Sequence, residues 1–215
     1  MTSVRISNGA GKVRVIAEDR DDIQVEGGAS VDEQGSVTTI NGTVGQIRVR
    51  VPTGTDVVAG TGSGRIKITG DVGAVAATTG SGRIEIESAR SVDARAETGS
   101  IIVDRSTELC RARGNTGRIS VAHSGGADVS TMTGRIVLKA VDGPVHAHCV
   151  TGRIEIEMAA AHDVDADTVT GRVSVSMPKG TQVHVLRGKD DDTPAPSDAD
   201  CTVRASSVSG RVDVT

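Results

Sequence analysis

A short motif, Thr-Gly-Arg followed by apolar residues at alternate positions, recurs along most of this 215-residue chain. Successive copies begin about 17–19 residues apart, except that the last follows after 39 residues, which fits one further coil plus an insertion. The first two copies carry an extra Ser-Gly. The residues that open them are Thr61, Thr79, Thr98, Thr116, Thr133, Thr151 and Thr170, with Ser209 in the last copy. A fixed period indicates repeats that stack on one another, so that like residues form columns.

Each repeat contains two stretches with the period of a β-strand. After the glycine, bulky residues alternate with polar ones, as in Ile84 and Ile86 or Ile154 and Ile156. Before the glycine, smaller residues alternate in the same way: Val92, Ala94, Ala96 and Thr98, then Val145, Ala147, Cys149 and Thr151, then Val164, Ala166, Thr168 and Thr170. The chain has no Phe, Tyr or Trp, so its core must be thin and built from these two rows. The pattern predicts an all-β fold, a parallel β-solenoid with coils of about 17–19 residues.

The remaining motif residues are expected to be architectural. The Thr column should form a ladder of hydroxyls near a corner, which the glycine rounds with a positive φ. Thr168 and Thr170 are expected to point inward, which opposes an ice-binding Thr face. Cys110, Cys149 and Cys201 fall on inward positions and should be packed thiols rather than disulfides.

Four segments are expected along the chain. Residues 1–50 keep the strand alternation without the motif, and we expect an irregular N-terminal cap or degenerate coils. Residues 51–186 should hold the regular solenoid repeats. Residues 187–200 are acidic and contain Pro, which predicts a mobile loop. Residues 201–215 should form a final coil, with an edge that carries no obvious cap.

The repeated Thr-Gly-x-Ile/Val-x-Ile/Val coils and the Val51-Pro-Thr-Gly-Thr55 entry resemble the bacterial putative-adhesin β-strand-repeat family, also called toastrack-like domains. The resemblance covers roughly residues 40–185. It implies a β-solenoid or prism with no established catalytic residues, often attached to membrane or envelope-stress proteins. The chain is also similar, more weakly, to bactofilins, which are filament-forming β-solenoids; those usually carry Phe near their ends, and this chain has none.

The most regular outward feature is the residue after the corner glycine, here called the Arg column. Its members are Arg65, Arg83, Arg118, Arg135, Arg153, Arg172 and Arg211, with Ser100 interrupting it. Cations stacked about 4.8 Å apart repel one another, so something must compensate them. Neighbouring carboxylates such as Glu85 and Glu155, with solvent, are one answer, and the interpretation we favour. An acidic partner or anionic polymer is the other.

Outward positions of the small row give a second candidate. Alignment of the repeats places His146 and His148 beside Asp165 and Asp167 of the next coil. Two imidazoles and two carboxylates could hold a transition metal, although a solvated His–Asp surface is the simpler interpretation and no metal or other cofactor is expected. Asp163, Asp165 and Asp167 are also the strand-borne acidic cluster that a carbohydrate-active enzyme would need.

We therefore expect a non-enzymatic scaffold that presents a rigid repetitive surface to a protein or anionic polymer. The alternatives are a filament-forming, bactofilin-like protein that self-associates through its coil ends, and a carbohydrate-active β-helix enzyme. The net charge of −4 and the missing aromatic rings oppose a nucleic-acid partner. The chain shows no signal peptide and no apolar run that could insert in a membrane, which favours a cytoplasmic protein.

Overall fold

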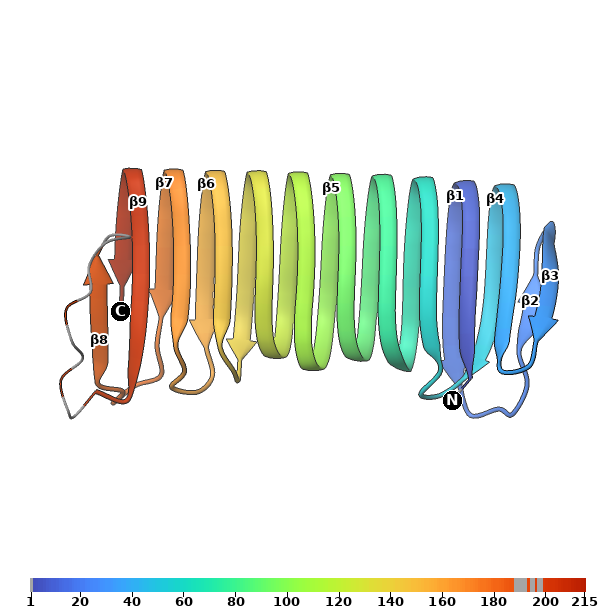
Figure 1. Cartoon of the computed structure of the whole chain (residues 1–215), viewed down its shortest axis with the longest axis horizontal. Helices are drawn as coiled ribbons and strands as arrows, with labels where there is room; N and C mark the ends of the chain where they lie inside the picture. Colours follow the sequence, from blue (N-terminus) through green and yellow to red (C-terminus); the bar gives the residue numbers. More distant parts are fainter. Residues whose placement is uncertain (1, 188–192, 194–195, 197–198) are drawn as a thin grey trace. The chain divides into compact units, whose positions relative to one another are not determined.

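The computed structural model describes residues 2–187, 193, 196 and 199–215, which form strands and turns and contain no helix (Figure 1). The strands are β1 (Ser3–Glu18), β2 (Gln24–Glu26), β3 (Ala29–Gln34), β4 (Val37–Pro52), β5 (Asp56–Val141), β6 (Val145–Met158), β7 (Val164–Ser176), β8 (Val183–Arg187) and β9 (Cys201–Val214). The all-β prediction is confirmed. The chain divides into two compact units, Met1–Glu108 and Leu109–Thr215, and β5 contributes to both.

In the first unit the strand order is β2-β4-β1-β5. Strand β1 lies between β4 and the start of β5 and is parallel to both, so that Lys12 is opposite Gln46 on one side and Arg65 on the other. Strands β2 and β3 pair antiparallel with β4. Residues 1–50 thus combine two long strands in the register of the repeats with two short antiparallel strands over their outer edge.

In the second unit the order is β5-β6-β7-β9-β8, and all the pairs are parallel. Ile136 is opposite Ile154, Ile154 opposite Val173, and Val173 opposite Val212. Like residues therefore stack in columns, as the repeat predicts. Most of the segment 187–200, expected to be a mobile loop, lies outside the described residues.

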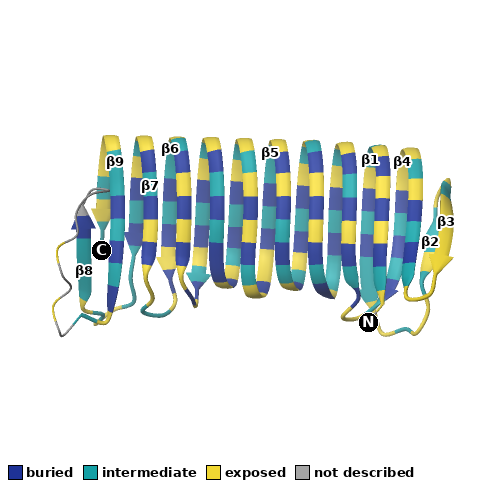
Figure 2. Ribbon diagram, viewed as in Figure 1, coloured by how far each residue is buried: buried dark blue, intermediate teal, exposed yellow. Residues whose placement is uncertain are grey.

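The core consists of the two predicted rows of aliphatic side chains. The bulky row is buried in every copy except the last, where Val212 and Val214 are half-buried. Ile84, Ile136 and Ile154 are fully enclosed, and the small row contributes Ala94, Ala147 and Ala166. Figure 2 shows buried and exposed residues alternating along the ribbon, as half-buried strands require. Cys110, Cys149 and Cys201 are free thiols in this core, as predicted, and burial raises the pKa of each.

The prediction for the corner threonines was wrong in part. Thr168 is buried, but Thr170 is exposed, and so are Thr98, Thr116, Thr133 and Thr151. Thr61 and Thr79, in the copies with the extra Ser-Gly, lie two positions earlier relative to the turning glycine and are buried. The physical reason is the corner itself. The chain turns at the glycine, and the inward positions on either side, such as Thr168 and Val173, are five positions apart with four outward or corner residues between them, so the alternation breaks.

The glycine at each corner cannot be replaced by another residue without strain. Gly134 has a φ of 149°, and a Cβ placed on it would lie 1.8 Å from the carbonyl oxygen of Gly117. The same approach recurs from turn to turn in each unit. The corner glycines therefore supply both the positive φ that was predicted and a close backbone contact between successive repeats.

Candidate functional site

The structure places the Arg column in register within each unit. In the second unit Arg135, Arg153, Arg172 and Arg211 are opposite one another on neighbouring strands. Arg118 follows Gly117, the glycine of the preceding corner, whose backbone lies against that of Gly134. In the first unit Arg65 and Arg83 follow Gly64 and Gly82, which are in contact in the same way.

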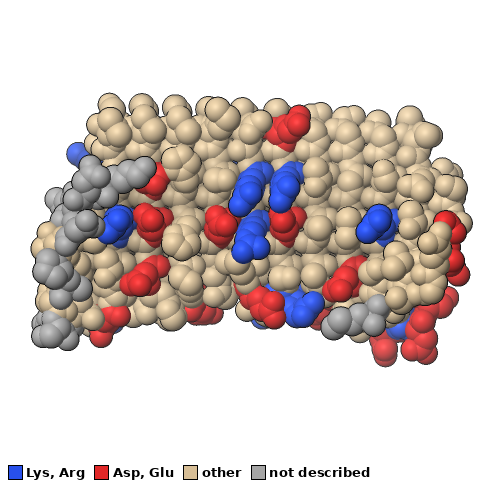
Figure 3. Space-filling model, viewed as in Figure 1, with Lys and Arg blue, Asp and Glu red and all other residues tan. Residues whose placement is uncertain are grey.

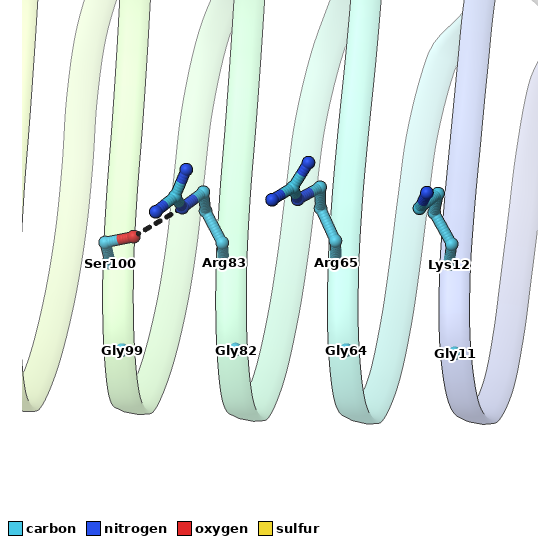
Figure 4. A pocket seen from close by; sticks show the side chains of 8 residues that line it. All are labelled: Gly11, Lys12, Gly64, Arg65, Gly82, Arg83, Gly99 and Ser100. Atoms are coloured by element: carbon cyan, nitrogen blue, oxygen red, sulfur yellow. Dashed lines mark hydrogen bonds between the residues drawn. The ribbon is translucent and has the colours of Figure 1, made fainter.

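In the first unit the column borders a groove of about 670 Å³. Its lining consists of Gly11, Lys12, Gly64, Arg65, Gly82, Arg83, Gly99 and Ser100. Figure 4 shows the cationic side chains rising from neighbouring turns of the ribbon on the same side, with the glycines at the corner below them. The groove therefore has a backbone floor without side chains and a row of cations along it. We call these residues the basic groove.

Carboxylates neutralise only part of the Arg column. Arg83 Nη1 lies 3.3 Å from Glu85 Oε1, and its Nε donates to Ser100 Oγ at 3.2 Å. Arg153 Nη1 lies 3.3 Å from Glu155 Oε1. No carboxylate of the described residues lies within ion-pair distance of Lys12 or Arg65, and both side chains are exposed. Neighbouring carboxylates, which we favoured from the sequence as the compensating groups, therefore pair with some of the arginines. The basic groove keeps a surplus of positive charge.

Sequence reasoning missed Lys12 as a member of this row. The insertion of β1 between β4 and β5 brings Lys12 beside Arg65 and Arg14 beside Lys67. A signal was present, because Gly11-Lys-Val-Arg-Val15 matches Gly64-Arg-Ile-Lys-Ile68 in residue class at every position. The match shows that the two segments share a register, although it does not say that they are neighbours.

The predicted His–Asp columns also form, in the second unit. His146 is opposite Asp165 and His148 opposite Asp167, as the alignment of repeats predicts. His148 Nδ1 contacts Asp167 Oδ2, and His146 Nδ1 lies 4.0 Å from Asp165 Oδ2. Among the described residues, no three or more His, Cys, Asp or Glu side chains are grouped so that they could hold a metal ion. These four residues therefore form two separate surface pairs.

Charges of both signs are interspersed on this face. Asp128, opposite His146, lies 3.6 Å from Arg111 Nε and 3.9 Å from Arg113 Nη2. Figure 3 shows acidic and basic side chains mixed over the visible surface rather than gathered by sign. Because acidic and basic side chains on this face pair with one another, it is a weaker candidate for binding a charged polymer than the basic groove.

The acidic cluster proposed for catalysis has structural partners. Asp163 accepts a hydrogen bond from the backbone N–H of Thr202 at 2.8 Å, and the other two carboxylates face the histidines. Ser130 precedes His148 and Asp167 in the same column, yet no hydrogen bond joins Ser130 to His148 in the described structure. The nucleophile–base contact that defines a hydrolytic triad is therefore missing from this row.

Comparison with known proteins gives little guidance. No family model matches the chain, and no curated protein matches it. One similar solved structure is that of a putative cell adhesion protein from Clostridium sporogenes ATCC 15579, with 8% sequence identity over 99% of this chain and 91% of that one, at a TM-score of 0.36. In the part of the chain that the structure describes, no helix is long and apolar enough to cross a membrane.

Proposed function

We propose that this chain is a parallel β-solenoid of the toastrack-like kind. The support is the register of its parallel pairs, in which each residue faces its counterpart about 18 positions along the sequence, as Ile136 faces Ile154. Stacked coils give each outward position a fixed neighbour about 4.8 Å away, so any side chain repeated in the sequence becomes a straight row on the surface.

The function that the geometry supports best is a non-enzymatic scaffold that binds an acidic partner in the basic groove. The observation that carries the proposal is the row of Lys12, Arg65 and Arg83, in which only Arg83 has a carboxylate within ion-pair distance among the described residues. Neighbouring cations in such a row repel one another by an amount on the order of 1 kcal/mol at a water-exposed surface. An anionic ligand would relieve this repulsion. The stacked strands, held by their aliphatic core, keep the cations in a straight row.

The glycine floor adds to the proposal. Because Gly11, Gly64 and Gly82 have no side chains, an extended ligand can lie against the corner backbone while its acidic groups meet the cations beside it. Guanidinium groups bind carboxylate, sulfate and phosphate groups through two parallel hydrogen bonds, which adds geometric selectivity. We infer that the partner is an acidic protein segment or an anionic polymer with closely spaced charges.

The other classes of function have less support. The Asp163–Asp167 carboxylates are engaged with backbone and histidine partners, which disfavours a carbohydrate-active enzyme. The net charge of −4 and the absence of aromatic rings disfavour nucleic acid. Three free thiols are typical of a reducing compartment, so we place the proposed scaffold in the cytoplasm.

The proposal is tested by measuring the binding of two probes, poly-L-glutamate and heparin, to the intact protein by fluorescence anisotropy. Charge reversal in the groove, Arg65→Glu with Arg83→Glu, should weaken binding by about tenfold or more. Arg95→Glu is the matched control, since Arg95 is an exposed arginine outside the groove that pairs with Asp93. Its effect should be at most about threefold. Equal losses in the two variants, or binding that does not weaken as salt rises, would refute the proposed site.

A further inference from the structure

Among the described residues, only the first part of the outer edge of β9 has a paired strand. Strand β8 pairs with Cys201–Ala205 and ends there, as Figure 1 shows beside the C-terminus. Residues 206–214 pair with β7 on the inner side, and no described residue pairs with their outer side. An unpaired strand edge is a template for another strand, and natural proteins usually block it with charge, proline or a covering element.

The hydrogen bonds of the last residue show which backbone groups face outward. The Thr215 N–H donates to Val175 O at 3.0 Å, and the Thr215 carbonyl accepts from Met177 N–H at 2.8 Å, so both groups of Thr215 point to the β7 side. Backbone direction alternates along a strand. The N–H and C=O groups of Gly210, Val212 and Val214 therefore point toward the open edge.

We propose that this edge pairs antiparallel with the same edge of a second copy of this chain, with Val212 opposite Val212 of the second copy. In this register Gly210 of each copy lies opposite Val214 of the other. All the outward-facing groups of Gly210, Val212 and Val214 then find partners, giving pairs of hydrogen bonds at each matched position.

Charge selects this register over its neighbours. Arg211 and Asp213 are both exposed and lie on the same face of β9, since they are two residues apart. With Val212 at the centre, Arg211 of each copy lies directly opposite Asp213 of the other, which makes two equivalent ion pairs. A shift of the centre by one residue toward either end keeps the hydrogen-bonding positions matched but places Arg211 opposite Arg211, or Asp213 opposite Asp213. Like charges directly opposite on two strands are destabilising.

The open end of the core gives an apolar reason for the same contact. A hollow of about 560 Å³ beside this end is lined by polar residues such as His148 and Asp167 together with Val208 and Val212. Val208 is 84% exposed, which makes it the most exposed of the large apolar side chains described. Val212 faces inward and is half-buried, whereas Val173, its counterpart on β7, is fully buried, so among the described residues no further turn covers Val212. A second copy supplies that cover.

The assembly is a closed dimer rather than a filament. Antiparallel pairing of identical edges is isologous, so one contact uses this edge of both partners and leaves it closed to a third. Filament growth would need a second open edge, and β8, the terminal strand of the second unit, has only five residues to offer. In the first unit β2 and β3 cover the outer edge of β4, and β3 itself carries the exposed residues Asp32 and Glu33, which oppose strand addition.

Sedimentation equilibrium of the full chain over a wide range of concentration tests the proposal. The wild type should show a monomer–dimer equilibrium. Arg211→Asp and Asp213→Arg each place like charges opposite one another twice, and each should raise the dissociation constant of the dimer by about tenfold or more. The double variant R211D/D213R restores opposite charges and should return to within about threefold of the wild type. Circular dichroism of each variant distinguishes loss of pairing from loss of folding.

Arg135→Asp is the matched control, because Arg135 belongs to the same column but its strand already has a neighbour in β6. It should leave the dimer unchanged. Hydrogen exchange provides a second measurement, since the amides of Val212 and Val214 should become protected as the dimer forms while that of Asp213 is protected in the monomer as well. A protein that stays monomeric at every concentration overturns the proposal. So does assembly beyond the dimer, or a double variant as weak as the two single ones.

Discussion

Replacement of one corner glycine gives a direct test of how the repeats are held together. In Gly134→Ala the new Cβ would lie 1.8 Å from the carbonyl oxygen of Gly117, and the backbone has a φ of 149°. A conformation that only glycine adopts readily costs about 1–3 kcal/mol for another residue, and overpacking against a hydrogen-bonded strand adds about 1–3 kcal/mol. We therefore expect the free energy of unfolding to fall by about 4 kcal/mol.

Gly180→Ala separates the two contributions. Gly180 also has a positive φ, of 87°, but nothing lies within 4 Å of the position of its Cβ. Only the backbone strain remains there, so the loss should be about 1–2 kcal/mol. Urea denaturation followed by circular dichroism measures both variants against the wild type. If the two variants lose the same stability within about 1 kcal/mol, the close contact between corners does not constrain the fold, and the reasoning fails.

Three other substitutions test the core, the turn and the thiols. Ile136 is fully buried, so Ile136→Ala should lower the free energy of unfolding by about 2–5 kcal/mol and Ile136→Val by about 1 kcal/mol in urea titrations. Asp56 accepts the Ala74 N–H at 2.7 Å, and Asp56→Ala should cost about 2 kcal/mol, more than Asp56→Asn, which keeps an acceptor. Burial raises the pKa of the Cys110 thiol to about 12, which favours its protonated form in the folded state. The contribution of Cys110 is complete below the ordinary thiol pKa and should be lost at about 1.4 kcal/mol per unit as the pH rises above ~8.5. Cys110→Ala should reduce the slope by that amount, while the raised pKa values of Cys149 and Cys201 leave a remaining slope.

The parts of the fold that could be predicted are those set by local periodicity. Positions such as Ile84 and Ile86 alternate with polar residues at a fixed distance from a glycine, so their burial follows from the pattern alone. The exposed position of Thr170 could not be obtained in this way. It depends on how many residues the chain uses to round the corner, which is a property of the turn rather than of the strand.

The candidate site was predictable where it depends on neighbouring repeats, and not where it depends on strands that are distant in the sequence. The register of Arg135 with Arg153, and of His148 with Asp167, follows from aligning repeats that are adjacent in the chain. Lys12 was missed because its neighbour Arg65 is not the next repeat along the sequence. A strand with the right alternation can pair at any open edge of the stack, and only the competition among edges in three dimensions decides which one it takes.

The two units have the same strand arrangement at their ends, but the terminal edge is covered to a different extent in each. A terminal strand lies one layer inside the edge, β1 beneath β4 and β9 beneath β8, so each chain terminus is held between two neighbours over at least part of its length. Strand β4 has 16 residues and is itself covered by β2 and β3, whereas β8 has five and covers only Cys201–Ala205. The same arrangement therefore covers one edge, and in the described part of the chain it leaves the outer side of Ser206–Val214 without a paired strand. Because that open segment carries Arg211 and Asp213 on either side of Val212, it is complementary to its own antiparallel copy, and this is why we assign self-association to it and binding of an acidic partner to the basic groove.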